Sequence, residues 1–166
     1  MKTFKTNGEG KEFLIKVLNE GEFFGYVDLI KGTNYAESAA AMEPTELSII
    51  PKDDFLALMH ANKDVASKMI KMLADNVIEQ EEQLLNLAYN SIRKRVAEAL
   101  LKLHRKYEQD NESHISILRD DLASMVGTAK ESVIRTLTDF KHEHLIDIDS
   151  GVITILDLQR LEQLPN

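Results

Sequence analysis

Apolar residues recur at helical spacing through residues 64–90, near the middle of the chain. Seven positions follow one another at alternating steps of four and three residues, which is a heptad pattern sustained for about three heptads. They are Ala66, Ile70, Leu73, Val77, Gln80, Leu84 and Leu87. The pattern predicts a dimerisation helix whose seam meets a second copy in a parallel, two-stranded arrangement. Packing within its own domain is the alternative, because Met69, Met72 and Ile78 widen the apolar stripe.

The residues before this helix alternate between apolar and polar positions over short stretches. Residues 2–18 predict two strands around the turn Asn7-Gly8, and residues 35–42 and 46–51 predict further short strands. Short antiparallel strands at close spacing favour a sandwich or a jelly roll. About five strands can be counted where a jelly roll has eight, so residues 1–63 are expected to form a partial β-domain.

The dimerisation helix is expected to end at Asn90-Ser91, which can cap a new helix, so a domain boundary is predicted at 89–91. The next helix, over about 92–107, has a buried stripe of Val96, Leu100 and Leu103. The same rules predict a short helix at 52–60, a polar loop at 109–113, a strand at 114–117 and a terminal helix at 157–164.

Two short helices joined by a tight turn are predicted over 118–141. Gly127 supplies the turn, because a positive φ is accessible to glycine without strain. The spacing of Thr128 and Glu131 predicts a capping box at the start of the second helix. This arrangement is typical of a helix-turn-helix.

The second helix, at about 129–141, divides into two faces when residues are placed at about 100° each. The apolar face holds Ala129, Val133, Leu137 and Phe140. The opposite face holds Lys130, Glu131, Ile134 and Arg135. In a helix-turn-helix such a helix enters the DNA major groove, where Arg can bind guanine and Glu can accept from cytosine. Lys130, Glu131 and Arg135 are therefore candidate base contacts, and an ordinary solvated helix face is the alternative.

A β-hairpin is predicted directly after these helices. Residues 145–156 contain two β-rich runs around Asp149-Ser150-Gly151. A hairpin in this place makes a winged helix-turn-helix, which is expected over 91–166. The whole chain is therefore expected to be α+β, with a partial antiparallel β jelly roll, a long dimerisation helix and a C-terminal winged helix-turn-helix.

Charge and composition exclude several kinds of site and cellular location. Of the net charge of −8, residues 1–91 carry −6 (9 Lys and Arg against 15 Asp and Glu) and residues 92–166 carry −2 (11 against 13), so the acidity lies mainly outside the winged helix. The absence of cysteine excludes disulfides and thiolate metal sites. No apolar run approaches the roughly 20 residues that span a bilayer, and no signal-peptide pattern is found, so a cytoplasmic protein without a membrane partner is expected.

The residues suggest neither an enzyme nor a metal site. The five histidines show no catalytic or metal-binding spacing, so no enzyme activity and no metal are predicted. Arg93, Lys94 and Arg95 lie in the first turn of a helix, where cations oppose the helix dipole. A phosphate partner would compensate, so these three are candidate DNA-phosphate contacts, and a solvated basic turn is the alternative.

Three motifs together resemble the Crp/Fnr family of bacterial transcription regulators. They are Gly21-Glu-Phe-Phe-Gly25, Asn86-Leu-Ala-Tyr89 and Val126-Gly-Thr-Ala-Lys-Glu-Ser-Val-Ile-Arg135. The resemblance covers nearly the whole chain and implies a cyclic-nucleotide-binding-type jelly roll, a homodimer, a winged helix on double-stranded DNA, and RNA polymerase as a partner. The family's Arg-Glu and later Arg correspond to Lys130, Glu131 and Arg135 here. The resemblance also implies phosphate contacts at Arg119 and Thr128.

The resemblance implies a ligand pocket in the β-domain. Its residues would be Gly25, Tyr26, Glu37, Ser38, Gln80 and Glu81. Members that bind cyclic AMP have a Glu after the cassette glycine and an Arg-Ser pair for the phosphate, where this chain has Tyr26 and Glu37-Ser38. Because a carboxylate repels an anion, cyclic AMP binding is expected to be weak or absent, and no cofactor is predicted. Met1 falls where family members are already within the jelly roll, which implies a longer parent chain or a truncated sensor.

Two functions follow from these features. The first is a dimeric, sequence-specific DNA-binding transcription regulator, with the helix at about 129–141 in the major groove of a palindromic site and with control through the β-domain. The second is a sensor for a small, cyclic-nucleotide-like molecule whose output is a protein–protein contact. The outward face of the second helix and the wing favour the first.

Overall fold

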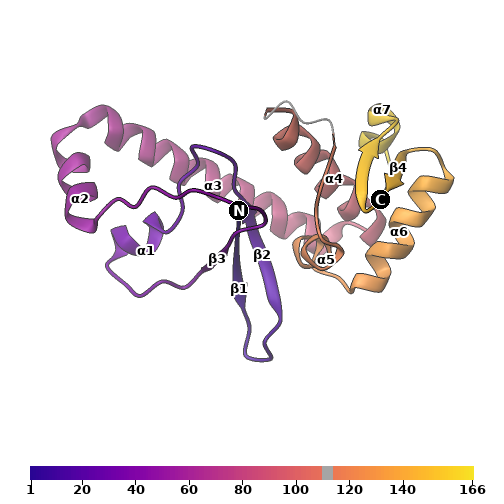
Figure 1. Cartoon of the computed structure of the whole chain (residues 1–166), viewed down its shortest axis with the longest axis horizontal. Coiled ribbons are helices and arrows are strands. Elements are labelled where there is room, and N and C mark those ends of the chain that lie inside the picture. The colour runs from indigo at the N-terminus through magenta and orange to yellow at the C-terminus, as the bar shows by residue number, and fades with distance from the viewer. Residues whose placement is uncertain (110–113) are drawn as a thin grey trace.

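The computed structural model describes residues 1–109 and 114–166, and a long helix joins its two halves (Figure 1). The first half comprises β1 (Lys2–Thr6), β2 (Glu12–Val17), α1 (Tyr26–Lys31), β3 (Ser38–Ala40), α2 (Lys52–Ala61) and the long α3 (Lys63–Tyr89). The second half comprises α4 (Ile92–Gln109), α5 (Arg119–Val126), α6 (Lys130–His142), β4 (Ile146–Asp149), β5 (Val152–Ile155) and α7 (Leu158–Glu162). The fold is α+β, as the sequence predicts.

The first half contains a small antiparallel sheet with the strand order β2-β1-β3. The two strands predicted within residues 2–18 are confirmed as the β1–β2 hairpin. The strand predicted at 35–42 is confirmed only over the three residues of β3. The strand predicted at 46–51 is wrong, because that segment is exposed and forms no strand. Its β-rich composition is not sufficient, since a strand needs a neighbour with which to pair.

Helix α1 was not predicted from the sequence. It is bounded by Gly25 and Gly32, whose φ angles of 78° and 73° place both in the left-handed region. Tyr26, its first residue, packs with Phe55 of α2 and Met69 of α3 in a small buried cluster. Six residues are too few to display a helical period, so the sequence pattern gave no signal for this helix.

The main hydrophobic core lies in the second half of the chain. Among its fully buried side chains are Val96, Leu100, Leu103, Leu122, Val133, Leu137, Phe140, Leu145, Ile146, Ile153 and Leu161. The buried stripe predicted for α4 is therefore confirmed. Leu14 and Val17 of β2 belong to the same cluster, so the β1–β2 hairpin contributes to the core of the winged helix. In Figure 1 the β1–β2 hairpin lies between the end of the molecule formed by α1 and α2 and the end formed by the winged helix.

The long helix α3 ends at Tyr89 and α4 begins at Ile92, close to the predicted break. The amide of Asn90 donates to Asn86 Oδ1 at 2.9 Å and to Glu98 Oε1 at 3.2 Å, which fixes the junction. The domain limits 1–63, 64–90 and 91–166 stay a prediction. Apart from Gln109, which belongs to α4, the loop predicted at 109–113 lies outside the described residues.

The wing is confirmed as the antiparallel pair β4–β5. Ser150 and Gly151 form its turn with φ angles of 48° and 89°. The strand predicted at 114–117 pairs with the wing only through Ile115, which exchanges both backbone hydrogen bonds with Ile153. The predicted terminal helix is present as α7. Within the described part of the chain, no helix is long and apolar enough to cross a membrane.

Candidate nucleic-acid interface

The turn between α5 and α6 is built around Gly127, whose φ is 68°. The N–H of the next residue, Thr128, donates to the carbonyl of Ala123 at 3.1 Å and closes the end of α5. Thr128 is thereby held within the turn, and the residue before the first turn of α6 is Ala129. No side chain caps α6, so the predicted capping box of Thr128 and Glu131 is wrong.

Helix α6 presents two faces, as predicted. Val133, Leu137 and Phe140 are buried in the winged-helix core, although Ala129 of the predicted apolar face is exposed. The opposite face is exposed and carries Lys130, Glu131, Ile134 and Arg135. This outer face of α6 is therefore free to meet a partner, while the inner face holds the helix in place.

The charged side chains on the outer face of α6 differ in whether they have a partner within the protein. Lys130 forms an ion pair with Asp120 of α5, with Nζ and Oδ2 2.6 Å apart. Glu131 and Arg135 have no side-chain hydrogen bond or ion pair within residues 1–109 and 114–166. An unpaired cation and an unpaired carboxylate one turn apart on an exposed face have donors and acceptors available for base edges.

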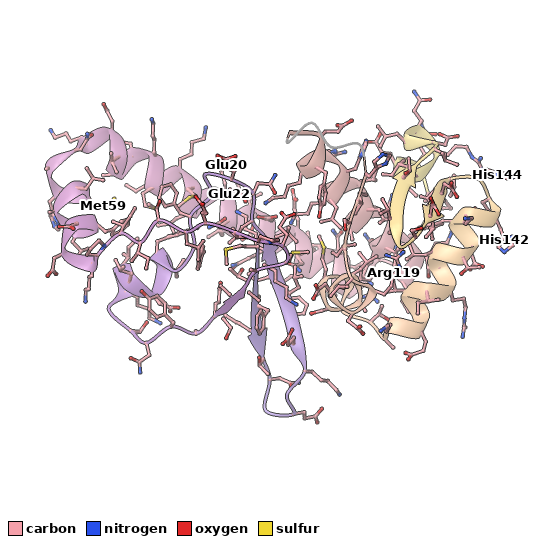
Figure 2. The ribbon with its side chains drawn as sticks, in the orientation of Figure 1. Glu20, Glu22, Met59, Arg119, His142 and His144 are labelled. Atoms are coloured by element: carbon pink, nitrogen blue, oxygen red, sulfur yellow. The ribbon has the colours of Figure 1, made fainter. Side chains whose placement is uncertain are left out.

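Arg119 connects the start of α5 to the wing. Its guanidinium donates to the carbonyl of Ile117 and to the carbonyl of Gly151, each at 3.1 Å. Burial lowers the pKa of Arg119 from its usual value. In Figure 2 Arg119 lies between α5 and the wing, whereas His142 and His144 lie at the far end of α6. Arg119 thus orients the wing relative to α5.

The three cations at the start of α4 all have partners within the protein. Arg93 pairs with Glu143 at 2.5 Å and lies over the ring of Phe140 at 4.7 Å from its centroid. Lys94 donates to the carbonyl of Glu162 at 2.9 Å. Arg95 donates to the carbonyl of Val126 at 2.7 Å. These contacts show how the basic turn packs, and its predicted phosphate contacts stay a prediction.

A cavity of about 620 Å³ lies between the β1–β2 hairpin, α1 and α3. It brings together Gly25, Tyr26, Glu37, Ser38 and Gln80, but Glu81 is not part of its lining. Lys5 also lines it and pairs with Glu37 at 3.8 Å, and the amide of Asn76 donates to the hydroxyl of Tyr26. Thr3, two residues before Lys5 on β1, also lines the cavity, and sequence reasoning missed both because nothing in the chain pattern shows which face of β1 meets the cavity.

The β1–β2 hairpin separates this cavity from the winged helix. Phe13 and Ile15 line the cavity, whereas Leu14 between them is buried in the winged-helix core. The N–H of Leu14 donates to the hydroxyl of Ser124 on α5, and that hydroxyl donates to the carbonyl of Glu12, both at 2.7 Å. The two faces of one strand thus contact the cavity and α5.

The predicted seam of α3 is partly open to solvent. Ile70, Val77 and Leu84 are 65%, 55% and 66% exposed. Leu73 packs on the small cluster of the first half, and Leu87 lies beside Gly127. The exposed positions form an apolar row without a partner in the described residues.

Comparison with known proteins is consistent across both halves. Residues 1–62 match the family of cyclic nucleotide-binding domains, and residues 94–164 match the family of Crp-like helix-turn-helix domains. The chain is 32% identical over 164 residues to a cyclic AMP receptor protein of Thermus thermophilus, a match that covers 99% of this chain and 74% of the relative. The chain belongs to the Crp/Fnr family.

Further Crp/Fnr proteins are similar to this chain in sequence or in fold. The cAMP-activated global transcriptional regulator CRP of Pasteurella multocida is 29% identical over 89% of this chain and 72% of its own length. A Crp/Fnr transcriptional regulator from Thermus thermophilus shares the fold, with a TM-score of 0.79 over 98% of this chain and 81% of that chain at 23% identity. As a Crp/Fnr protein, the chain is a DNA-binding transcription regulator and not an enzyme.

Proposed function

We propose that two copies of this regulator pair along α3 and insert the outer face of α6 into successive major grooves of a palindromic DNA site. The observation that carries the proposal is this face itself: Lys130, Glu131 and Arg135 are exposed on a helix whose opposite side is buried. A recognition helix needs such a rigid base, because base edges are discriminated only by donors and acceptors held in a fixed position.

The chemistry assigns different roles to the three side chains. Arg135 can bind guanine N7 and O6 with two parallel hydrogen bonds, and Glu131 can accept from cytosine N4. Lys130 has no planar fork, so its base preference depends on how it is held. Arg119, which donates to the wing carbonyl of Gly151, and Thr128, in the turn between α5 and α6, are the proposed phosphate contacts. Arg93, Lys94 and Arg95, each bound to a partner within the protein, would contact phosphates with their remaining donors.

Dimerisation is supported by the exposed seam of α3. Ile70, Val77 and Leu84 recur at steps of seven residues and are more than half exposed in the single chain. Burying such a row against a second copy removes apolar surface from water, which is the main favourable term in association. Two-fold symmetry would then place the recognition helices about 34 Å apart, one turn of DNA.

Control is proposed to come from the cavity in the first half. Glu37 lines it, so we expect cyclic AMP to bind weakly, because the carboxylate faces the region where the family's cyclic phosphate would lie. The hairpin that lines the cavity also contacts α5, which gives a ligand a direct route to the DNA-binding half. RNA polymerase as a partner and a cytoplasmic location follow from the family and stay part of the proposal.

The test is selection of duplexes from a random DNA pool, with Arg135→Ala as the matched variant. We expect enrichment of a palindrome, and we expect Arg135→Ala to lose about 1–3 kcal/mol on that site while relaxing one base position in each half. An equal loss on all sequences would make Arg135 a phosphate contact. No enrichment by the unmodified protein, together with binding to a protein partner, would favour a sensor with a protein–protein output instead.

A further inference from the structure

Helix α5 begins with two acidic residues that contact different parts of the molecule. Asp121 is buried and pairs with Lys2 of β1. Asp120 is exposed and pairs instead with Lys130, the first residue of the recognition helix α6, with Oδ2 and Nζ 2.6 Å apart. Both members of the second pair are exposed, with side chains 69% and 45% accessible. An acid therefore lies on the DNA-facing side of the molecule, next to Arg119.

We propose that Asp120 is a positioning residue that determines DNA specificity through Lys130. It anchors the Lys130 ammonium so that this cation contacts a base edge and is withheld from phosphates of unrelated DNA. The proposal rests on the proposed function, and it assigns to Asp120 a role that the base contacts alone do not require.

The geometry makes the anchoring possible. Gly127 and Thr128 hold the end of α5 and the start of α6 in a fixed turn, so Asp120 and Lys130 face each other from rigid elements. An ammonium group carries three donors, so one can bind Asp120 while the others remain available. Lysine is a flexible point charge without the fork of arginine, and an anchoring carboxylate supplies the orientation that it lacks.

The electrostatics explain why the anchor favours specific over non-specific binding. Non-specific affinity comes almost entirely from cations that neutralise phosphates and release counterions. A cation already paired with Asp120 releases fewer counterions, so the pair removes about one effective positive charge from non-specific binding. A specific site is affected less, because there Lys130 bonds to a base while it stays paired. An exposed ion pair is weak enough not to prevent docking.

The experiment measures binding of the full chain to two fluorescent duplexes of equal length, the palindrome from the selection and a scrambled sequence. Affinity is followed by anisotropy from roughly 50 to 200 mM salt, the range in which phosphate contacts dominate the change. Asp120→Asn should tighten binding to the scrambled duplex by about eightfold at roughly 0.1 M salt and steepen its salt slope by about 0.9, the value of one additional phosphate contact. The logarithm of the affinity for the palindrome should change by less than half as much as the logarithm of the affinity for the scrambled duplex.

Three variants separate anchoring from a general effect of charge. Asp53→Asn removes the same charge from the first turn of α2, at the opposite end of the molecule, and should change neither affinity (Figure 1). Asp120→Glu keeps a carboxylate within reach of Lys130 and should restore the palindrome preference. In the Lys130→Ala background, Asp120→Asn should lose most of its effect on the scrambled duplex. Thermal melting followed by circular dichroism checks that each variant is folded.

Each result has one meaning. Equal tightening on both duplexes, or the same tightening in the Lys130→Ala background, would overturn the proposal because Asp120 would then act only as a repulsive charge. Unchanged binding on both duplexes would also overturn it. Failure of the unmodified protein to prefer any duplex would instead refute the proposed function, and the role of Asp120 would fail with it.

Discussion

Leu14 is one of the side chains through which the first half of the chain enters the core of the winged helix. It is 2% exposed and belongs to the same buried cluster as Leu122 and Val126 of α5. Leu14→Ala removes three carbon atoms, which at about 0.8 kcal/mol each corresponds to roughly 2.4 kcal/mol of transfer free energy. The cavity left behind adds to this, because the surroundings relax only partly. We therefore expect a loss of about 3–4 kcal/mol in the free energy of unfolding.

The assay is urea unfolding followed by circular dichroism, with Ile15→Ala as the matched control. Ile15 is the next residue on β2, but it lines the cavity and is only half-buried, so we expect its truncation to cost about half as much. A single transition that shifts for Leu14→Ala with an unchanged slope would show that hairpin and winged helix unfold together. Two transitions, with only one moved by Leu14→Ala, would refute the reasoning.

Three further predictions concern the dimer, the turn and acid stability. Val77→Glu should convert a dimer to a monomer in sedimentation velocity, whereas Ile78→Glu, equally exposed but off the seam, should leave the dimer intact. Gly127→Ala should cost about 1–2 kcal/mol in urea unfolding, because an alanine at φ 68° is strained. Burial raises the pKa of Glu22, but the hydrogen bonds from Lys106 and from the N–H of Asn19, together with the charges of Lys106 and Lys16, outweigh it and hold the pKa below its usual range. The resulting stability is present above the unfolded pKa and lost as pH falls through the lower folded pKa, so Glu22→Gln should flatten the stability decline below about pH 4.5, measured by urea titration at several pH values.

The faces of α6 and the wing could be predicted from the sequence because both depend on local order. Val133, Leu137 and Phe140 return to the same side of a helix through its 3.6-residue period, and that side is buried as expected. The wing turn needs residues that accept positive φ, and Ser150-Gly151 supplies them. The predicted capping box at the start of α6 was wrong for a local reason too, because the N–H of Thr128 closes the turn at Gly127 by donating to the carbonyl of Ala123.

The contacts between the halves could not be predicted, because they join residues that are distant in sequence. Ser124 bonds to the backbone of Glu12 and Leu14, which lie 112 and 110 residues away. Nothing in the alternation of β2 indicates that Leu14 faces α5 while its neighbours face a cavity. The basic turn at the start of α4 shows the same difficulty: a pattern of charges does not reveal whether carbonyls of the protein or phosphates of DNA accept their hydrogen bonds.

These distant contacts change how a signal would reach the DNA. Control through α3 alone would require the cavity to alter dimer geometry, with the winged helix following as a rigid body. The first turn of α5 offers a shorter route, because Asp121 is paired with Lys2 of the hairpin and the adjacent Asp120 is paired with Lys130 of the recognition helix. A shift of the hairpin would move both acids together, since they lie on one helical turn. The two routes differ in consequence: if α3 alone carries the signal, removing the Lys2–Asp121 pair leaves DNA specificity unchanged, whereas coupling through α5 requires that specificity falls with it.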